Sequence, residues 1–307
     1  MPLSYNDFVP KLFRSTLPLF ASLVLALTGG ACYQQDVQAM PLGNFAQLMQ
    51  SGKTCSSQKA YSQAISFFQQ AVEAKPDSPE AKLELGKALS RAGDQERALS
   101  ALFESLKLSP KNSETRSEIA VILMKRGSWD EAGGQLKQVL DMVPADNNVR
   151  GNYAICLEQL GYIDAAAEQF SIIVKAQPRS VEAIYNLAVA LQLQGQTDQA
   201  ADAYKKTIAL APNHSLAFMG LGKCFLARKD YKNAALIEKR AIQLFPNNHW
   251  AYLALGDAYN GLGQKGDSLE AYRKAIQINP KDPACRAVLT NLLKQKTASL
   301  PGAFTTR

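Results

Sequence analysis

Residues 181–214 read VEAIYNLAVALQLQGQTDQAADAYKKTIALAPNH, and this stretch decides the fold. Its apolar residues recur at three- and four-residue steps, which is the period of an amphipathic helix. Gly195 divides the stretch in two, because a residue free to adopt positive φ ends a helix. Pro212 ends the second part, since proline lacks a backbone donor and clashes with the preceding turn. The stretch therefore predicts two helices joined by a tight turn.

The same pattern recurs along the chain with a period of 34 residues. One proline marks each copy, and chance or biased composition does not produce such a regular spacing. The prolines are Pro76, Pro110, Pro144, Pro178, Pro212, Pro246 and Pro280. Placing each proline at position 32 of its copy divides the chain into seven repeats. They are 45–78, 79–112, 113–146, 147–180, 181–214, 215–248 and 249–282.

Small residues occupy two fixed positions of every repeat. Position 8 is Gly or Ala throughout, and position 20 is Ala in all copies but the last, which has Ser268. Small side chains there let the two helices of a hairpin approach closely. Because one hairpin cannot bury its apolar face alone, neighbouring hairpins must stack around a continuous core.

In its length, its small residues and its closing proline, this repeat closely resembles the tetratricopeptide repeat family. The resemblance covers residues 45–282 and a final half-repeat. It implies an all-α fold, a right-handed superhelical solenoid of seven antiparallel helix pairs. Residues 283–296 predict one more amphipathic helix, which caps the last repeat. Residues 297–307 form a tail without pattern.

The N-terminal residues resemble an export signal. Lys11 and Arg14 precede an apolar run at 17–27, which is too short to span a bilayer. Small residues then lead to Cys32 in the sequence TGGAC, which resembles a bacterial lipobox. We expect a signal peptide at 1–31, lipidation of Cys32 and a tether at 32–44. Ordinary cleavage after Ala39 is the alternative, and it would leave a soluble periplasmic or secreted protein.

The positive charge is concentrated in the last third of the chain. The net charge is +7, and residues 215–307 carry 14 Lys or Arg against 6 Asp or Glu. This basic patch is either a solvated face or a contact for anionic lipid, cell-wall polymer or an acidic protein. An export signal and the lack of a recognition motif argue against nucleic acid. The patch comprises Arg228, Lys229, Lys232, Lys239, Arg240, Arg273 and Lys274.

Nothing in the sequence predicts catalysis, a metal or a cofactor. The five cysteines show no CxxC spacing, and Cys156 and Cys224 are expected to be core thiols. The two histidines, His214 and His249, are expected in solvated connectors between repeats. Gly261-x-Gly263-x-x-Gly266 matches a dinucleotide fingerprint but follows a predicted helix instead of a strand. Repeats account for nearly every residue between tether and tail, so we expect no enzyme.

The resemblance implies a concave groove lined by positions 2, 5, 6, 9, 12 and 13 of each first helix. In the middle repeats these positions predict an apolar floor with exposed Met and Tyr side chains, suited to an adaptable peptide site. Packing between repeats is the alternative role of each residue. The floor comprises Val121, Met124, Ile155, Tyr185, Val189, Leu193 and Met219.

Asn152 and Asn186 occupy position 6 of consecutive repeats. In some relatives asparagines there grip the backbone of an extended peptide, and an amide supplies both the donor and the acceptor that this needs. We therefore expect the groove to bind a protein or peptide and the lipid anchor to attach the chain to a membrane. The predicted function is a scaffold that assists assembly or secretion in the bacterial envelope, facing the periplasm or the cell exterior. A surface factor that binds polyanions is the alternative, and the oligomeric state stays open.

Overall fold

The structure is a computed structural model that describes residues 44–298. Within that range all regular structure is helical, and no strand is present. The expected signal segment, Cys32 and the tail from residue 299 lie outside the described residues. The helices are α1 (Phe45–Ser57), α2 (Tyr61–Ala74), α3 (Pro79–Ala92), α4 (Gln95–Leu108), α5 (Ser113–Arg126), α6 (Trp129–Met142), α7 (Asn147–Gln159), α8 (Ile163–Ala176), α9 (Val181–Leu193), α10 (Thr197–Leu210), α11 (Ser215–Ala227), α12 (Tyr231–Leu244), α13 (His249–Gly261), α14 (Lys265–Ile278) and α15 (Pro283–Ala298).

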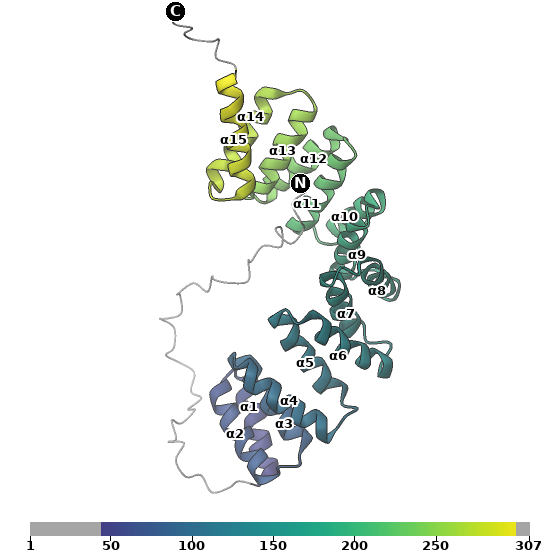
Figure 1. Ribbon diagram of the computed structural model, residues 1–307, viewed down its shortest axis with the longest axis vertical. Helices are drawn as coiled ribbons and strands as arrows, with labels where there is room; N and C mark the ends of the chain where they lie inside the picture. The colour runs from purple at the N-terminus through teal and green to yellow at the C-terminus, as the bar shows by residue number, and fades with distance from the viewer. Residues whose placement is uncertain (1–43, 299–307) are drawn as a thin grey trace, which may run out of the picture. The chain divides into compact units, whose positions relative to one another are not determined.

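The helices pair in chain order, and each pair contacts the next one (Figure 1). α1 packs on α2 and α3 on α4, and this continues to α13 on α14. Each second helix also contacts the first helix of the following pair, as α2 contacts α3. The fold is therefore the all-α solenoid of seven helical hairpins, with α15 as an additional helix at its C-terminal end.

Each first helix begins where a polar side chain caps it. The residue before the helix, position 34 of the preceding repeat, accepts a hydrogen bond from a backbone N–H of the first turn. Such a cap satisfies a donor that the helix itself leaves unpaired. The capping residues of the seven pairs are Asn44, Ser78, Asn112, Asp146, Ser180, His214 and Asn248.

The turn between the two helices of a pair needs a left-handed residue at position 15. Glycine supplies it in five pairs, with φ between 76° and 94°. Lys59 and Lys229 occupy the same position with φ of 61° and 58°. A lysine there carries the steric cost of the left-handed region, which glycine avoids.

Position 8 of the first helix lies against position 24 of the second helix. A β-carbon at Gly52, Gly86 or Gly256 would overlap the ring of Phe68, the side chain of Leu102 or the ring of Tyr272, respectively. Position 20 is also buried, and the hydroxyl of Ser268 donates to the carbonyl of Gly256 at 2.8 Å. The small residues therefore allow the close helix approach that the sequence predicted.

Arginine at position 4 ties successive repeats together. The guanidinium of Arg116 donates to Gln135 at 2.7 Å and to the carbonyl of Pro110 at 2.8 Å. Arg150 makes the equivalent bond to Gln169 at 2.6 Å. Arg286 of α15 donates to the carbonyl of Lys281 at 3.0 Å. α15 therefore follows the register of a first helix.

α15 closes the last pair through a small apolar cluster. Cys285 is fully buried there beside Leu253 and Ala275. The helix ends at Ala298, two residues beyond the expected end at 296. Cys156 and Cys224 are buried free thiols, as the sequence predicted, and burial raises the pKa of each to about 11.

Candidate functional site

The nine residues predicted for the groove lie on four first helices, α5, α7, α9 and α11. Every one of their side chains is half-buried. The structure therefore offers a partly covered apolar floor, not the row of exposed Met and Tyr side chains that the sequence predicted. They are Val121, Met124, Asn152, Ile155, Tyr185, Asn186, Val189, Leu193 and Met219.

Contacts between repeats explain why this floor is partly covered. Met124 packs against the apolar core that α3 to α7 share. The ring of Tyr185 lies 6.0 Å from that of Tyr204 and 4.6 Å from that of His214. Ile155 packs against the neighbouring cluster. These side chains therefore contribute to stacking as well as to the surface.

Asn152 and Asn186 meet at one cavity of about 240 Å³ between α7, α8 and α9. Ile155 lines the same cavity, whereas the other six residues predicted for the groove do not. The asparagine ladder is therefore the part of the predicted site that the structure brings together. The full lining is Asn148, Gly151, Asn152, Ile155, Phe170, Ile173, Gln177, Ser180, Glu182, Ala183 and Asn186.

The cavity combines an apolar wall with polar groups. Ile155, Phe170 and Ile173 supply the wall. In the part of the chain that the structure describes, the side-chain amides of Asn152 and Asn186 make no hydrogen bond within the protein. Each amide therefore has a donor and an acceptor available to a peptide backbone.

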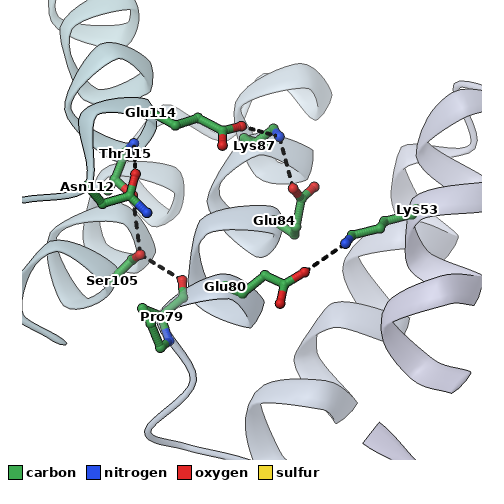
Figure 2. Close-up of polar contacts among 9 residues, drawn as sticks. All are labelled: Lys53, Pro79, Glu80, Glu84, Lys87, Ser105, Asn112, Glu114 and Thr115. Atoms are coloured by element: carbon green, nitrogen blue, oxygen red, sulfur yellow. Dashed lines mark hydrogen bonds and ion pairs between the residues drawn. The ribbon is translucent and has the colours of Figure 1, made fainter. Parts of the chain in front are cut away.

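The first helices of the N-terminal repeats carry an ion-pair network (Figure 2). Lys53 at position 9 donates to Glu80 at position 2 of the next repeat, over 2.7 Å. Lys87 repeats this contact with Glu114 at 2.8 Å and also binds Glu84 at 2.9 Å. The sequence reasoning missed these pairs, although a separation of 27 residues occurs in both.

These pairs shift the lysine pKa values. A hydrogen bond to Glu80 raises the pKa of Lys53. Burial alone would lower the pKa of Lys87, but its bonds to Glu114 and Glu84 outweigh burial and raise it. The charged side chains on the N-terminal first helices therefore pair with one another, whereas the amides in the cavity at α7 and α9 have no partner within the described protein.

Three members of the predicted basic patch have partners within the chain. Arg228 pairs with Asp198 at 2.6 Å. The Lys239 ammonium lies 5.4 Å from the centre of the Tyr259 ring. The Arg240 guanidinium lies 5.8 Å from the centre of the Phe218 ring. These cations therefore stabilise the fold through ion-pair and cation–π contacts.

The remaining members of the patch are exposed on α12, α14 and the turn before α12. Arg273 and Lys274 line a cavity of about 590 Å³ in the seventh repeat. Asp267 and Glu270 line the same cavity, so its walls carry both signs of charge. Lys229 occupies the left-handed turn position, and Lys232 is exposed on α12. The charge excess is thus partly balanced locally.

The burial of Glu238 was not predicted from the sequence. This residue occupies position 24 of the sixth repeat and is 1% exposed, and its Oε1 has no hydrogen-bond partner. Burial raises its pKa well above the ordinary value, although the charge of Lys223 opposes this. Aromatic residues or leucine occupy the same position in the other repeats.

His214 lies in a connector between repeats, as the sequence predicted, whereas His249 is the first residue of α13, and both side chains are half-buried instead of solvated. His214 caps α11 by accepting a hydrogen bond from the backbone of Ala217 at 3.2 Å. His249 is half-buried, with its Nε2 3.4 Å from Asp282. Among the described residues no group of three His, Cys, Asp or Glu side chains is placed to hold a metal ion.

Stacked hairpins with a partly apolar, amide-bearing first-helix face define a helical-repeat scaffold. A model described as tetratricopeptide repeat matches residues 57–114, 123–191 and 225–292, and a second with the same description matches 185–249. The chain belongs to the tetratricopeptide repeat family. Such repeats typically form non-catalytic scaffolds for protein–protein interaction. No helix in the described range combines the length and apolar character needed to cross a membrane.

Solved structures share this fold at low sequence identity. A part of a repeat protein from Cytophaga hutchinsonii is 15% identical with a TM-score of 0.66, over 80% of this chain and 98% of that one. A repeat protein from Parabacteroides merdae is 15% identical with a TM-score of 0.60, over 81% and 98%. PilW, a type IV pilus biogenesis factor, is 21% identical with a TM-score of 0.58, over 69% and 98%. No curated protein sequence matches the chain.

Proposed function

We propose that this chain is a non-catalytic scaffold of the bacterial cell envelope. It holds an extended segment of a partner protein against α7 and α9. The observation that carries the proposal is the placement of Asn152 and Asn186 at one cavity of about 240 Å³. Two amides one repeat apart can bind two separate peptide units of an extended segment without reading its side chains, while the apolar wall accepts a side chain of the partner.

The envelope location rests on the N-terminal sequence. The basic residues, the apolar run at 17–27 and Cys32 have the order of a lipoprotein export signal. Acyl chains on Cys32 would anchor the repeats to a membrane, since each buried methylene contributes about 0.8 kcal/mol. PilW, with the same fold, is described as a pilus biogenesis factor, and assistance of an envelope machine is the role we propose here.

A crosslinked pulldown from envelope membranes tests the partner site. We expect the double variant Asn152→Ala/Asn186→Ala to lose the partner that the wild type retains. Asn213→Ala is the matched control, because Asn213 is an exposed asparagine in a connector. Identical partner sets for the wild type and the double variant would refute binding through the two amides.

Metabolic labelling with a radioactive fatty acid tests the anchor. We expect the wild type to incorporate label and to sediment with membranes. Cys32→Ala should lose both properties, whereas Cys55→Ala should keep them. Label in the Cys32→Ala variant, or cleavage after Ala39 in the wild type, would refute the lipid anchor while leaving the scaffold intact.

A polyanion-binding role is the second candidate, favoured by the exposed cations Lys232, Arg273 and Lys274. Salt distinguishes the two roles. Binding to an anionic polymer should weaken steeply between low and physiological ionic strength, because exposed charges beyond about 10 Å are screened. Binding through the asparagine amides should change little over the same range.

A further inference from the structure

A polar contact recurs along the edge formed by the turns within the hairpins. Position 14, just before the left-handed turn residue, reaches back to an acidic residue at position 18 of the preceding repeat. The donor is arginine or glutamine. The contacts are Arg126 to Glu96 at 3.0 Å, Gln194 to Asp164 at 2.8 Å and Arg228 to Asp198 at 2.6 Å.

Between the second and the sixth repeat, one step lacks this contact. The acid of the third repeat is present as Asp130 in the first turn of α6, but position 14 of the fourth repeat is Leu160. The shared register places Leu160 opposite Asp130, as Arg228 stands opposite Asp198. Asp130 is exposed, and no hydrogen bond or ion pair involves its side chain in residues 44–291. Leu160 is 38% exposed.

The same turn exposes a second large side chain. Tyr162 occupies the residue before α8, and it makes no side-chain cap hydrogen bond. The equivalent Asp94 and Asp230 cap α4 and α12, whereas the residues before α2, α6, α10 and α14 also make no such cap. Tyr162 is 62% exposed, so its ring is not in the core. The fourth repeat thus presents Leu160 and Tyr162 where the third and fifth repeats have polar residues, of which Arg126 and Gln194 bind the preceding repeat.

We propose that Asp130, Leu160 and Tyr162 form a second docking surface, which takes a partner segment carrying an arginine beside an apolar side chain. The chain itself supplies the template, because Arg126 and Arg228 already bind the equivalent acids. The arginine of the partner pairs with Asp130, and its neighbouring side chain packs on Leu160 and Tyr162. Guanidinium suits this role since its planar donors match a carboxylate.

This surface is separate from the asparagine cavity. None of its three residues lines that cavity, and all three belong to the turn edge. Leu262 occupies position 14 of the seventh repeat and is also exposed, but the opposing residue is Lys232. The contact position between the sixth and seventh repeats therefore has no acid to bind arginine, so Leu262 serves as a matched control.

Two peptide libraries provide the probe. Both libraries contain seven-residue peptides with random flanking residues. The central residue is arginine in the first library and norleucine in the second. We expect the full chain to select binders from the arginine library. It should bind them about threefold to fivefold more tightly than peptides of the norleucine library, which is the gain expected from an exposed ion pair. Equal recovery from the two libraries would overturn the proposal.

Three variants assign the binding to this surface. Asp130→Asn removes the charge, Leu160→Arg supplies the internal donor of the other repeats, and Tyr162→Asp supplies a helix cap. Leu160→Arg should raise stability while it abolishes the arginine preference, so unfolding cannot explain the loss. Tyr162→Asp should also raise stability, and it should weaken binding of peptides from both libraries because the ring is lost. Leu262→Arg and Asn152→Ala/Asn186→Ala should keep the preference. A preference that survives Leu160→Arg, or that the asparagine double variant removes, would overturn the proposal.

Discussion

The carboxyl group of Glu238 lies against the backbone of Gly222 in the sixth hairpin, where a β-carbon on the glycine would overlap the carboxyl oxygen. The equivalent glycines Gly52 and Gly256 lie under the rings of Phe68 and Tyr272. The sixth hairpin therefore holds a buried acid in an aromatic site. Because a buried polar atom without a hydrogen-bond partner costs free energy, this hairpin contains a local weakness.

Replacing the acid by a ring should stabilise the protein. We expect Glu238→Phe to raise the free energy of unfolding at neutral pH by about 1–3 kcal/mol. The ring should occupy the space over Gly222 as Phe68 does over Gly52. Urea unfolding of the full chain measures the change. The control Glu168→Phe alters an exposed residue of α8, and an equal gain there would contradict the explanation.

The effect of Glu238 should depend on pH. Burial raises its pKa above the ordinary value, so the unfolded chain ionises first as pH increases. The contribution of protonated Glu238 to stability is fully present below about pH 4. It decreases as pH rises toward the pKa that Glu238 has in the folded protein. Unfolding measured at pH 4, 6 and 8 should show the gap between Glu238→Phe and wild type widening with pH. A constant gap would contradict this.

Glycine should be better than lysine at the two exceptional turns. Lys59→Gly and Lys229→Gly should each stabilise the fold by about 0.5–1 kcal/mol, because glycine adopts positive φ without strain. The reverse change Gly93→Lys should destabilise it by a similar amount. Thermal unfolding of the three variants checks the signs. A loss of stability in both lysine variants would show that these side chains make stabilising contacts that outweigh backbone strain.

The two lysines of the N-terminal network should contribute unequally. Lys87 and Glu84 are only 14% and 15% exposed, so Lys87→Met leaves a partly buried carboxylate behind and should cost about 1–2 kcal/mol. Lys53 and Glu80 are 45% and 58% exposed, and Lys53→Met should cost less than about 0.5 kcal/mol. Urea unfolding compares them, and equal costs would contradict the role given to burial.

The starts of the first helices were predictable because their signals are local and repeated. The spacing of the seven prolines placed the repeat starts, and the first helices begin at those residues. The end of α15 was predicted at 296, two residues too early, and Thr297 occupies the position where glycine follows most first helices. Lys59 and Lys229 could be assigned to the left-handed turn only by aligning them with the glycines of the other repeats.

The candidate site was predictable only in part, because burial depends on neighbouring repeats. The positions of Asn152 and Asn186 in the repeat were enough to predict that they share one surface. The sequence could not show that Tyr185 would be partly covered by His214 and Tyr204, which belong to other helices. Nor does an isolated glutamate predict burial, since acidic side chains are seldom fully buried, although position 24 is apolar or aromatic in the other repeats.

Photocrosslinking in living cells tests partner binding at α7 and α9 most directly. Glu182 is exposed and lines the asparagine cavity, so a photoreactive residue introduced there faces any bound segment. The same residue at Glu168 of α8, which does not line the cavity, is the control. We predict a crosslinked partner from position 182 that disappears in the Asn152→Ala/Asn186→Ala background, and none from position 168. A crosslink from position 168 alone, or one from position 182 that persists in the double variant, would contradict partner binding through the asparagine amides.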